Sequence, residues 1–213
     1  APVILAKKHL KNAVRALVVN TGNANAGTGK EGLARALSVC SALASQLKCK
    51  PIQVLPFSTG VIMEPLPVDR IRAGLPVAVA SKASWLDAAE AIMTTDTVPK
   101  AFSRKLRLSG GEAVVTGIAK GAGMIRPDMA TLLGFVATDA KVAPKALQSM
   151  VKRIADRSFN CATGDGDTST NDSFMLIASG VGVEIKNEKD RKILERALLD
   201  VSRLLAQAII RDG

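Results

Sequence analysis

Apolar residues recur along the chain with two different spacings, and these spacings predict an alternation of strands and helices. Short apolar runs bounded by turn-forming residues predict strands at residues 14–20, 52–57, 102–108, 113–118, 132–138 and 173–179. Apolar residues at helical spacing predict helices at residues 32–47, 85–93, 144–157 and 190–210, with at most a short helix at 68–73. Residues 1–10 read as a strand from the middle of a domain. We therefore expect the polypeptide to begin before Ala1 and to continue beyond Gly213.

The turn between two of the predicted strands indicates the class of the sheet. Ser109, Gly110 and Gly111 follow the strand at 102–108, and this Ser-Gly-Gly sequence before the next strand predicts a β-hairpin. The strands of a hairpin are antiparallel, so the sheet is not purely parallel. We predict an α/β fold with mixed sheets and without internal repeats.

Two of the predicted helices have one apolar face each. In the helix at 32–47, Cys40 shares this face with Leu33, Leu37 and Leu47, so we expect its thiol to pack in the core. In the helix at 190–210 the apolar stripe comprises Ile193, Leu194, Ala197, Leu198, Val201, Leu204, Leu205, Ala208 and Ile209.

The composition is that of an ordinary globular protein. Hydrophobic residues make up 47% of the 213 positions and charged residues 23%, which permits a sizeable core and excludes intrinsic disorder. No apolar run approaches the roughly 20 residues that span a bilayer, and the first residues lack the order of a secretory signal. The three cysteines form no C-x-x-C pair, which favours a reducing compartment. We expect a cytoplasmic protein of bacterial type; an organellar location would require a transit peptide before Ala1.

The net charge of +10 is distributed unevenly along the chain. Residues 1–130 contain 17 Lys and Arg against 8 Asp and Glu, whereas residues 131–213 contain 12 against 11. The densest basic run comprises Lys100, Arg104, Lys105 and Arg107. A solvated strand face, a site for an anionic small substrate and a nucleic-acid surface are three interpretations of this run. We do not expect nucleic acid, because aromatic residues are only 3% and tyrosine is absent, which removes stacking partners for bases.

The single histidine restricts the nucleophilic chemistry of the chain. His9 lies in a polar, basic stretch, and we interpret it as a surface residue rather than as part of a nucleophile–histidine–carboxylate site or a metal site. An enzyme built from this sequence therefore needs a base other than imidazole. An N-terminal threonine is one solution, because its own α-amine, with an ordinary pKa of about 7.7–8, deprotonates its hydroxyl.

Two polar loops resemble ligand-binding motifs but lack residues that the chemistry requires. Around the sequence A-G-T-G-K-E (26–31), Ala24 stands where a phosphate-binding loop needs its first Gly, and Glu31 where it needs Ser or Thr for magnesium. The sequence D-G-D-T-S-T-N-D (165–172) resembles the start of a calcium loop, but Thr170 stands where that loop needs Gly and Leu176, further on, where it needs Glu. We expect no metal. A nucleotide- or nucleic-acid-binding domain is the alternative from a different functional class.

The most informative stretch spans residues 120–140 and reads K-G-A-G-M-I-R-P-D-M-A-T-L-L-G-F-V-A-T-D-A. By composition alone it is a glycine loop and a proline turn that lead into a strand. It closely resembles the hallmark segment of the ornithine acetyltransferase (glutamate N-acetyltransferase) family. Four further segments resemble family motifs in the family order, namely N-T-G-N-A-N-A-G-T-G (20–29), L-P-F-S-T-G-V-I (55–62), A-I-M-T-T-D-T-V-P-K (91–100) and D-G-D-T-S-T-N-D-S (165–173). Met63 departs from the glycine that the resemblance leads us to expect after S-T-G-V-I.

The resemblance implies that the chain cuts itself between Ala130 and Thr131. Residues 1–130 would then be the C-terminal part of an α subunit, and residues 131–213 the N-terminal part of a β subunit, both contributing to one catalytic domain. In this family the two fragments stay together and usually pair into a heterotetramer.

The resemblance also implies the roles of individual residues. Thr131 is the nucleophile, which takes an acetyl group from N-acetylornithine and passes it to glutamate in a ping-pong cycle. Thr59 and Gly60 form the oxyanion hole. Thr95 and Lys120 contact the substrate, and the positive charge of Lys120 favours the neutral amine of Thr131.

The fold implied is the α/β/β/α sandwich that the family shares with self-cleaving aminopeptidases. A self-cleaving aminopeptidase or amidohydrolase is therefore the nearest alternative, with the same nucleophile and a different acyl acceptor. The resemblance implies no cofactor, although the family divides by whether acetyl-CoA also serves as acetyl donor.

Overall fold

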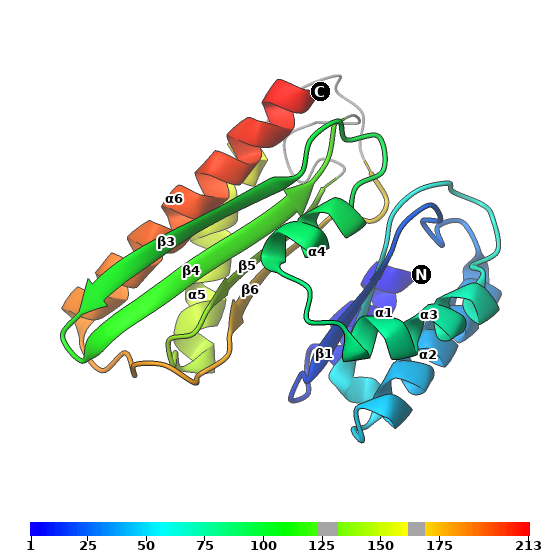
Figure 1. Ribbon diagram of the computed structural model, residues 1–213, viewed down its shortest axis with the longest axis horizontal. Coiled ribbons are helices and arrows are strands. Elements are labelled where there is room, and N and C mark those ends of the chain that lie inside the picture. Colours follow the sequence, from blue (N-terminus) through cyan, green and yellow to red (C-terminus); the bar gives the residue numbers. More distant parts are fainter. Residues whose placement is uncertain (123–131, 162–168) are drawn as a thin grey trace. The chain divides into compact units, whose positions relative to one another are not determined.

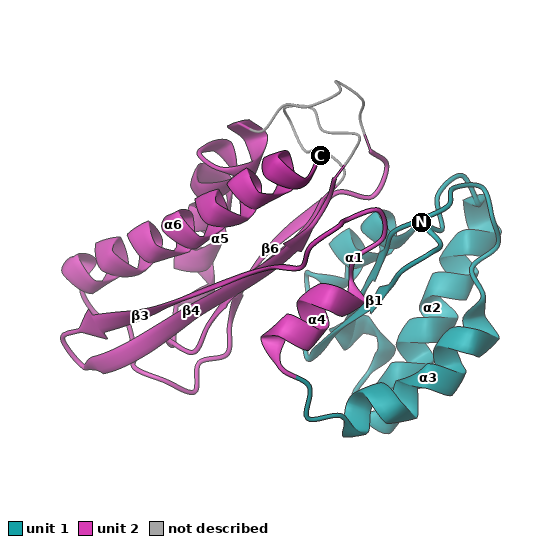
Figure 2. Cartoon of the chain, turned by 45° about the horizontal axis from the view of Figure 1, so that its top comes forward, with its two compact units in different colours: residues 1–83 teal, residues 84–213 magenta. Residues whose placement is uncertain are grey.

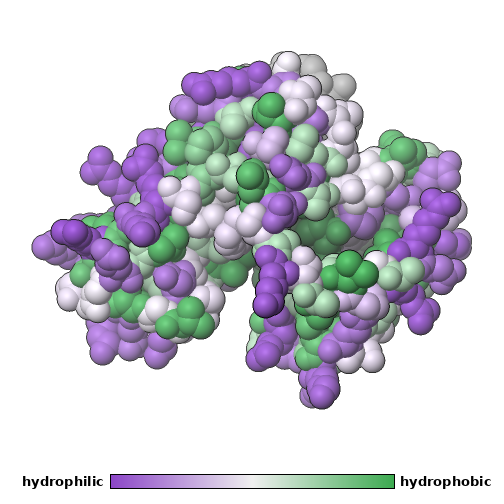
Figure 3. All heavy atoms as spheres, viewed as in Figure 1, coloured by the Kyte–Doolittle hydropathy of each residue, from purple (hydrophilic) through white to green (hydrophobic). Residues whose placement is uncertain are grey.

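The computed structural model describes residues 1–122, 132–161 and 169–213. The chain forms two compact units, Ala1–Ala83 and Ser84–Gly213 (Figure 2). The bond between Ala130 and Thr131 belongs to the second unit and lies outside the described residues. None of the helices in the described ranges is both long and apolar enough to cross a membrane. Hydrophilic side chains cover much of the surface visible in Figure 3, with apolar side chains scattered among them.

The unit Ala1–Ala83 is built on two parallel strands. They pair from Ala16↔Val54 to Asn20↔Ser58, so both strands end at the same edge of the sheet. The elements of this unit are α1 (Pro2–His9), β1 (Ala16–Asn20), α2 (Gly29–Gln46), the 3-10 turn η1 (Pro51–Gln53), β2 (Val54–Ser58) and α3 (Val68–Ala80), shown in blue to green in Figure 1. Its core lies between the strands and helices α1, α2 and α3 and includes the fully buried Cys40, as the helical spacing predicts.

The unit Ser84–Gly213 has a mixed sheet of strand order β3-β4-β5-β6. The pairs β3–β4 and β4–β5 are antiparallel, and β5–β6 is parallel, so the predicted hairpin and the mixed sheet are confirmed. Helices α5 and α6 lie side by side along the sheet (Figure 2). The elements are α4 (Trp85–Ala91), β3 (Lys100–Leu108), β4 (Gly111–Lys120), β5 (Leu133–Thr138), α5 (Pro144–Asp156), the 3-10 turn η2 (Phe159–Cys161), β6 (Ser173–Ala178) and α6 (Glu188–Asp212).

Helix α6 supplies much of the core of this unit. The side chain of Asn187 accepts a hydrogen bond from the N–H of Asp190 at 2.8 Å, which caps the first turn. Leu198, Val201 and Leu205 on its apolar stripe are fully buried against the sheet, as the sequence predicts.

The ends of three strands meet at one edge of this sheet. Lys120, the last residue of β4, pairs with Leu133, the first pair-forming residue of β5. Leu133 in turn pairs with Ser173, the first residue of β6. Residues that follow β4 and residues that precede β5 and β6 are therefore neighbours in space.

Residues Pro2–His9 form a helix, so the prediction of a strand at residues 1–10 is wrong. Pro2 occupies the first turn, where its missing N–H costs least. Leu5, Ala6 and His9 then lie on one buried face at helical spacing, while Ile4 is 65% exposed. The apolar, β-branched start of this segment suggested a strand, but its burial follows the helical period.

Three other predicted boundaries or faces differ from the structure. Strand β2 begins at Val54 rather than at residue 52, because Pro51–Gln53 form a 3-10 turn. Helix α3 runs through Pro76 to Ala80, well beyond the short helix predicted at 68–73. In α2, Leu37 and Leu47 are exposed although we expected them on the apolar face with Cys40.

Truncation of Leu198 to Ala is expected to destabilise the protein by about 2–5 kcal/mol, because it removes a fully buried side chain and leaves a cavity. Val181→Ala is the matched control at a position that is 84% exposed, and its effect should stay within about 0.5 kcal/mol. The free energy of unfolding from denaturant titration measures both, and equal values would place Leu198 outside the core.

Candidate active site

The segment predicted to form an oxyanion hole begins where β2 ends. Because β1 and β2 are parallel, Asn20 and Ser58 lie side by side, and the Ser58 hydroxyl donates to the Asn20 side-chain oxygen at 2.6 Å. The next N–H, that of Thr59, donates to the Asn20 carbonyl at 3.1 Å. The parallel pair thus brings together two motifs that are about 40 positions apart in the sequence.

The asparagine-rich loop that follows β1 holds this segment by amide hydrogen bonds. The side-chain NH₂ of Asn23 donates to the carbonyls of Glu64 and Pro65, each at 3.2 Å. Its side-chain oxygen accepts the N–H of Asn25 at 2.8 Å. Both asparagines are buried, and the side chain of Asn23 connects the two loops. The side chain of Asn25 bonds to Gly32 and Thr28, which fixes the asparagine-rich loop itself.

Gly60 is required by backbone geometry. Its φ of +130° lies in a region that favours glycine. A Cβ at this position would lie 2.3 Å from the carbonyl carbon of Gly22 and 2.5 Å from the nitrogen of Asn23. Among the described residues, no acceptor is found for the Gly60 N–H. The N–H of Thr59 is already bonded, so a contribution of Thr59 to an oxyanion hole has to come from its hydroxyl.

Met63 adopts the left-handed backbone conformation that the expected glycine would adopt. Its φ is +63°, and its N–H donates to the Ala26 carbonyl at 2.8 Å. The side chain is 74% exposed, which relieves it of packing constraints. Met63 thus adopts a backbone conformation that favours glycine.

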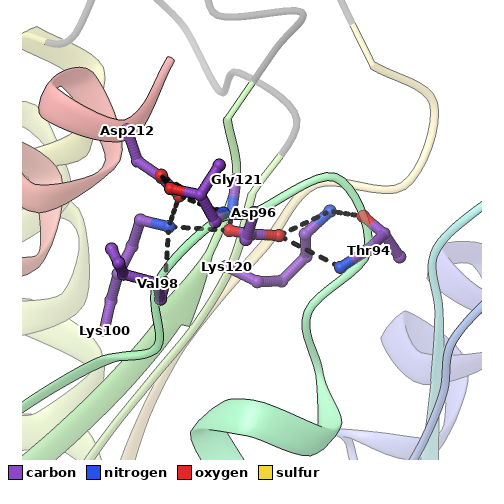
Figure 4. Close-up of polar contacts among 8 residues, drawn as sticks. Thr94, Asp96, Val98, Lys100, Lys120, Gly121 and Asp212 are labelled. Carbon is purple, nitrogen blue, oxygen red and sulfur yellow. Dashed lines mark hydrogen bonds and ion pairs between the residues drawn. The ribbon is translucent and has the colours of Figure 1, made fainter.

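In the unit Ser84–Gly213, the predicted substrate residue Lys120 lies beside a buried cluster of charges (Figure 4). The ammonium of Lys100 lies 2.8 Å from a carboxylate oxygen of Asp96 and 2.5 Å from one of Asp212. Asp96 also accepts the N–H of Thr94 at 3.1 Å and the N–H of Gly121 at 2.6 Å. The cluster links the T-T-D-T motif, β3, the end of β4 and the last turn of α6.

Lys120 is buried at the end of β4, with its ammonium held by this cluster. Its Nζ donates to the Thr94 hydroxyl at 2.7 Å and lies 3.8 Å from Asp96. Burial lowers the pKa of Lys120, and the charge of Lys100 lowers it further, whereas Asp96 and Asp172 oppose this shift. Lys120 is therefore an amine whose charge responds to its neighbours, as expected of a functional lysine.

The resemblance named only Thr95 of the T-T-D-T motif as a site residue, but other residues of the motif also make contacts at the site. Thr95 is exposed, and its neighbour Thr94 is the threonine that bonds to Lys120. Lys100 is buried and ion-paired, so the interpretation of the basic run as a solvated face is wrong at this position. Arg104, Lys105 and Arg107 are exposed.

Asp172 is a second carboxylate near the same edge of the sheet. One of its oxygens accepts the N–H of Leu132 at 3.0 Å. Its other oxygen is buried and has no hydrogen-bond partner among the described residues. Burial raises the pKa of Asp172 to about 7, outweighing the lowering effect of the hydrogen bond from Leu132 and of the charge on Lys120.

Sequence reasoning missed the roles of Asp96, Asp172 and Asp212. The first two stand inside motifs that the resemblance identified, T-T-D-T and T-N-D, and this was the only signal available for them. Asp212 comes from the end of the final helix, where no local pattern marks it. Ala130 and Thr131 lie outside the described residues.

His9 is buried, so the prediction that it is a surface residue is wrong. Its Nδ1 is 2.8 Å from the carbonyl oxygen of Val54, so the ring joins α1 to the start of β2. It occupies the buried face of α1 because that segment is a helix. In the described ranges, no group of three or more His, Cys, Asp or Glu side chains is arranged to hold a metal ion.

The fold of the chain is similar to that of a class of solved enzymes. The L-aminopeptidase D-Ala-esterase/amidase of Ochrobactrum anthropi, described as a variant of the Ntn hydrolase fold, matches 84% of this chain and 64% of its own with a TM-score of 0.53. Its sequence identity is only 10%, so the likeness concerns the fold alone. The predicted fold class, the α/β/β/α sandwich of the self-cleaving aminopeptidases and their relatives, is confirmed.

The chain belongs to the ArgJ family, which matches it over residues 1–213. It is 58% identical over 220 residues to the arginine biosynthesis bifunctional protein ArgJ of Neisseria meningitidis, and 52% identical over 231 residues to that of Colwellia psychrerythraea. Both alignments cover all of this chain and 54% of the relative, so the chain spans about half the length of these relatives.

A solved structure gives the same result. The ornithine acetyltransferase of Mycobacterium tuberculosis, crystallised with ornithine, is 35% identical with a TM-score of 0.54. The match covers 62% of this chain and 70% of that protein. The resemblance inferred from the five motifs is therefore confirmed at the level of the family.

Replacement of Lys100 by Met is expected to destabilise the protein by about 3–5 kcal/mol, because it leaves the buried carboxylates of Asp96 and Asp212 without their cation. Lys105→Met, on the same strand and exposed, is the matched control and should change the free energy of unfolding by about 0.5 kcal/mol or less. Denaturant titration at neutral pH measures both variants.

The same pair of variants tests the electrostatic origin of the effect. Burial raises the pKa of Asp212, but hydrogen bonds from Lys100 and Thr97 outweigh burial and lower it to about 2 from an ordinary 3.8. A depressed pKa stabilises the fold above the ordinary value, and this stabilisation is lost as the pH falls from 3.8 to about 2. Wild type and Lys105→Met should lose stability over this range, and Lys100→Met should lose less. If the free energy of unfolding fell equally with pH in Lys100→Met and in wild type, the ion pair between Lys100 and Asp212 would not be the source of the effect.

Proposed function

We propose that the protein to which this chain belongs transfers the acetyl group of N-acetylornithine to glutamate, giving ornithine and N-acetylglutamate. The observation that carries the proposal is the family match over residues 1–213, together with the likeness to the 35% identical ornithine acetyltransferase that was crystallised with ornithine. The arrangement of Thr59, Gly60 and Lys120 at strand ends supports it, because strand ends hold functional groups on a rigid scaffold.

Self-cleavage comes first in the proposed sequence of reactions. The hydroxyl of Thr131 attacks the carbonyl carbon of Ala130, the peptide C–N bond breaks, and an ester forms while the nitrogen of Thr131 takes up a proton. Water then hydrolyses the ester, which leaves a carboxylate on Ala130 and a free α-amine on Thr131. The amine is the base that the chain otherwise lacks.

Acetyl transfer uses the same hydroxyl. The α-amine of Thr131 takes the hydroxyl proton, the oxygen attacks the acetyl carbonyl, and the proton passes to the departing ornithine. The α-amine of glutamate then attacks the acetyl-threonine ester and restores the hydroxyl. In both steps the Thr59 hydroxyl and the Gly60 N–H donate to the negative carbonyl oxygen, and Thr95 and Lys120 bind the substrate.

The proposal extends to the assembly and its surroundings. The fragments ending at Ala130 and beginning at Thr131 stay together and pair into a heterotetramer in the cytoplasm. No cofactor takes part. The ArgJ relatives are called bifunctional, and if this enzyme is bifunctional too, acetyl-CoA is its second acetyl donor. Nucleic acid and membranes are not partners.

A self-cleaving aminopeptidase or amidohydrolase is the second candidate. The observation that favours it is the likeness of fold to the Ochrobactrum anthropi enzyme. Its acyl acceptor is water, so the two candidates differ in whether release of the acyl group requires an amino acid.

Cleaved full-length protein exposed to N-acetylornithine without glutamate should gain one acetyl group on the fragment that begins T-L-L-G-F. Addition of glutamate should discharge the group as N-acetylglutamate faster than water does. Intact-mass measurement of both fragments, before and after glutamate, follows the two steps and the cleavage itself.

Thr131→Ala lacks the hydroxyl and should remain uncut and unlabelled, whereas Thr131→Ser keeps the hydroxyl and should retain part of both reactions. An acetylated alanine variant would show that the nucleophile is another residue. Release of free acetate at the same rate with and without glutamate would favour the hydrolase.

Thr59→Ala should slow self-cleavage and acetyl transfer, raising each barrier by about 2.7–4 kcal/mol, because the lost hydrogen bond forms only when negative charge develops. The KM for N-acetylornithine should change little. Thr28→Ala is the control: Thr28 lies in the asparagine-rich loop after β1, and its hydroxyl bonds to Asn25. Wild-type rates for both reactions in Thr59→Ala would remove Thr59 from the oxyanion hole.

A further inference from the structure

We propose that Asp96 and Asp172, here called the anchor carboxylates, hold the backbone at Gly121 and Leu132, on either side of the segment that contains the bond to be cleaved, and that they are positioning residues for self-cleavage. The inference rests on the proposed function, in that the cleaved bond is taken to join Ala130 and Thr131. The anchors themselves rest on hydrogen bonds within the described residues.

The anchors act where the ladder between β4 and β5 stops. The last pair of this antiparallel ladder is Lys120↔Leu133. One residue further on each strand, Gly121 donates its N–H to Asp96 at 2.6 Å, and Leu132 donates its N–H to Asp172 at 3.0 Å. Each carboxylate thus accepts a hydrogen bond from a backbone N–H just beyond the last pair of the ladder.

Asp96 is itself fixed from several sides. It accepts hydrogen bonds from the Thr94 N–H and the Lys100 ammonium, and Lys100 is held in turn by Asp212 in the last turn of α6. These bonds outweigh the effect of burial and keep the pKa of Asp96 below its ordinary value, so the anchor is charged at neutral pH. A charged acceptor forms a hydrogen bond roughly twice as strong as a neutral one.

Asp172 is fixed by the parallel pairing of β5 with β6. The carbonyl of Leu132 accepts the N–H of Ser173 at 3.0 Å, while its N–H donates to the side chain of Asp172. Both polar backbone groups of Leu132 are therefore bonded to consecutive residues. Leu132 directly follows Thr131 in the sequence, so this anchor fixes the position from which the nucleophile extends.

Lys120 connects the two anchors electrostatically. Its ammonium lies 3.8 Å from Asp96, and both Asp96 and Asp172 raise its pKa against the effect of burial. The predicted substrate lysine and the two flanking backbone groups thus share the same pair of carboxylates. Loss of either anchor changes the geometry on one side of the bond and the environment of Lys120.

Positioning matters for self-cleavage because the hydroxyl and the carbonyl that react are on adjacent residues of one chain. Intramolecular attack depends on near-contact geometry, and a displacement of about 1 Å costs about 10²-fold in rate. Removal of an anchor is therefore expected to slow cleavage by about this factor without removing a reacting atom.

The test uses matched carboxylates of the same unit, in full-length protein freshly refolded. Asp96→Ala and Asp172→Ala should each slow cleavage about 10²-fold. Asp190→Ala is the control for Asp96, because Asp190 is buried and accepts the Ser109 N–H at 3.0 Å away from this edge. Asp139→Ala is the control for Asp172, because Asp139 follows β5 at its other end and accepts the Val114 N–H at 2.8 Å. Both controls should cleave like wild type.

The conservative variants separate anchoring from charge. Asp172→Asn and Asp96→Asn keep an oxygen that accepts the backbone N–H, so an anchoring role predicts faster cleavage than in the alanine variants. Equal loss in Asn and Ala variants would overturn anchoring in favour of a purely electrostatic role. Equal slowing in the controls, or wild-type cleavage in both alanine variants, would overturn the proposal.

A second readout does not depend on cleavage. In Thr131→Ala protein, amide hydrogen exchange followed by NMR should speed up at Gly121 when Asp96 is replaced by Ala, and at Leu132 when Asp172 is replaced. Unchanged exchange at both amides would refute the anchors even if the wild-type chain cleaves. Faster exchange together with a wild-type chain that never cleaves would refute the proposed function and leave the anchors in place.

Discussion

Lys100 carries a positive charge into the interior of the unit Ser84–Gly213, and the surrounding structure depends on the neutralisation of that charge. Removal of an ion from water costs several kcal/mol, which is recovered only with close, well-bonded partners. Asp96 and Asp212 supply them at 2.8 and 2.5 Å. Because one partner belongs to the T-T-D-T motif and the other to the end of α6, formation of the pair fixes both elements against β3. The position of Gly121, and with it the exit from β4, follows from Asp96.

In the unit Ala1–Ala83, neutral side chains and not ion pairs hold the segment that follows β2. Asn20 and Asn23 hold Ser58–Pro65 by amide and hydroxyl hydrogen bonds, and no ionised side chain takes part in these bonds. Such bonds do not titrate between acid and neutral pH. Acid should therefore disturb the charged cluster beside Lys120 well before it disturbs the segment that contains Thr59 and Gly60.

Sequence periodicity predicted the helices and strands whose buried residues recur regularly. It could not predict side-chain contacts between residues that are distant in the sequence. The helix at 190–210 was predictable because its apolar stripe repeats over many turns, and the hairpin because a Ser-Gly-Gly turn separates two apolar runs. Helix α1 has only eight residues, too few for a period to outweigh its β-branched start. Lys100 looked like one of four surface cations because its burial is not visible in the sequence: Asp96 is four positions away, but Asp212, its second partner, is 112 positions away. The motifs located the candidate site, but the contacts of Asp96 and Asp172 required the folded chain.

Gly117 and Gly60 differ in whether a second substitution elsewhere in the chain can make room for a side chain at that position. At Gly117 the atoms that would meet a new Cβ, each at 2.9 Å, belong to the side chains of Leu205, Val136 and Val201. A shorter residue at one of these sites makes room, so a damaging change at Gly117 has second-site suppressors. At Gly60 the obstacle is the main chain of Gly22 and Asn23, which every amino acid carries. No substitution elsewhere removes it, and a genetic screen for suppressors of a Gly60 variant should return only revertants.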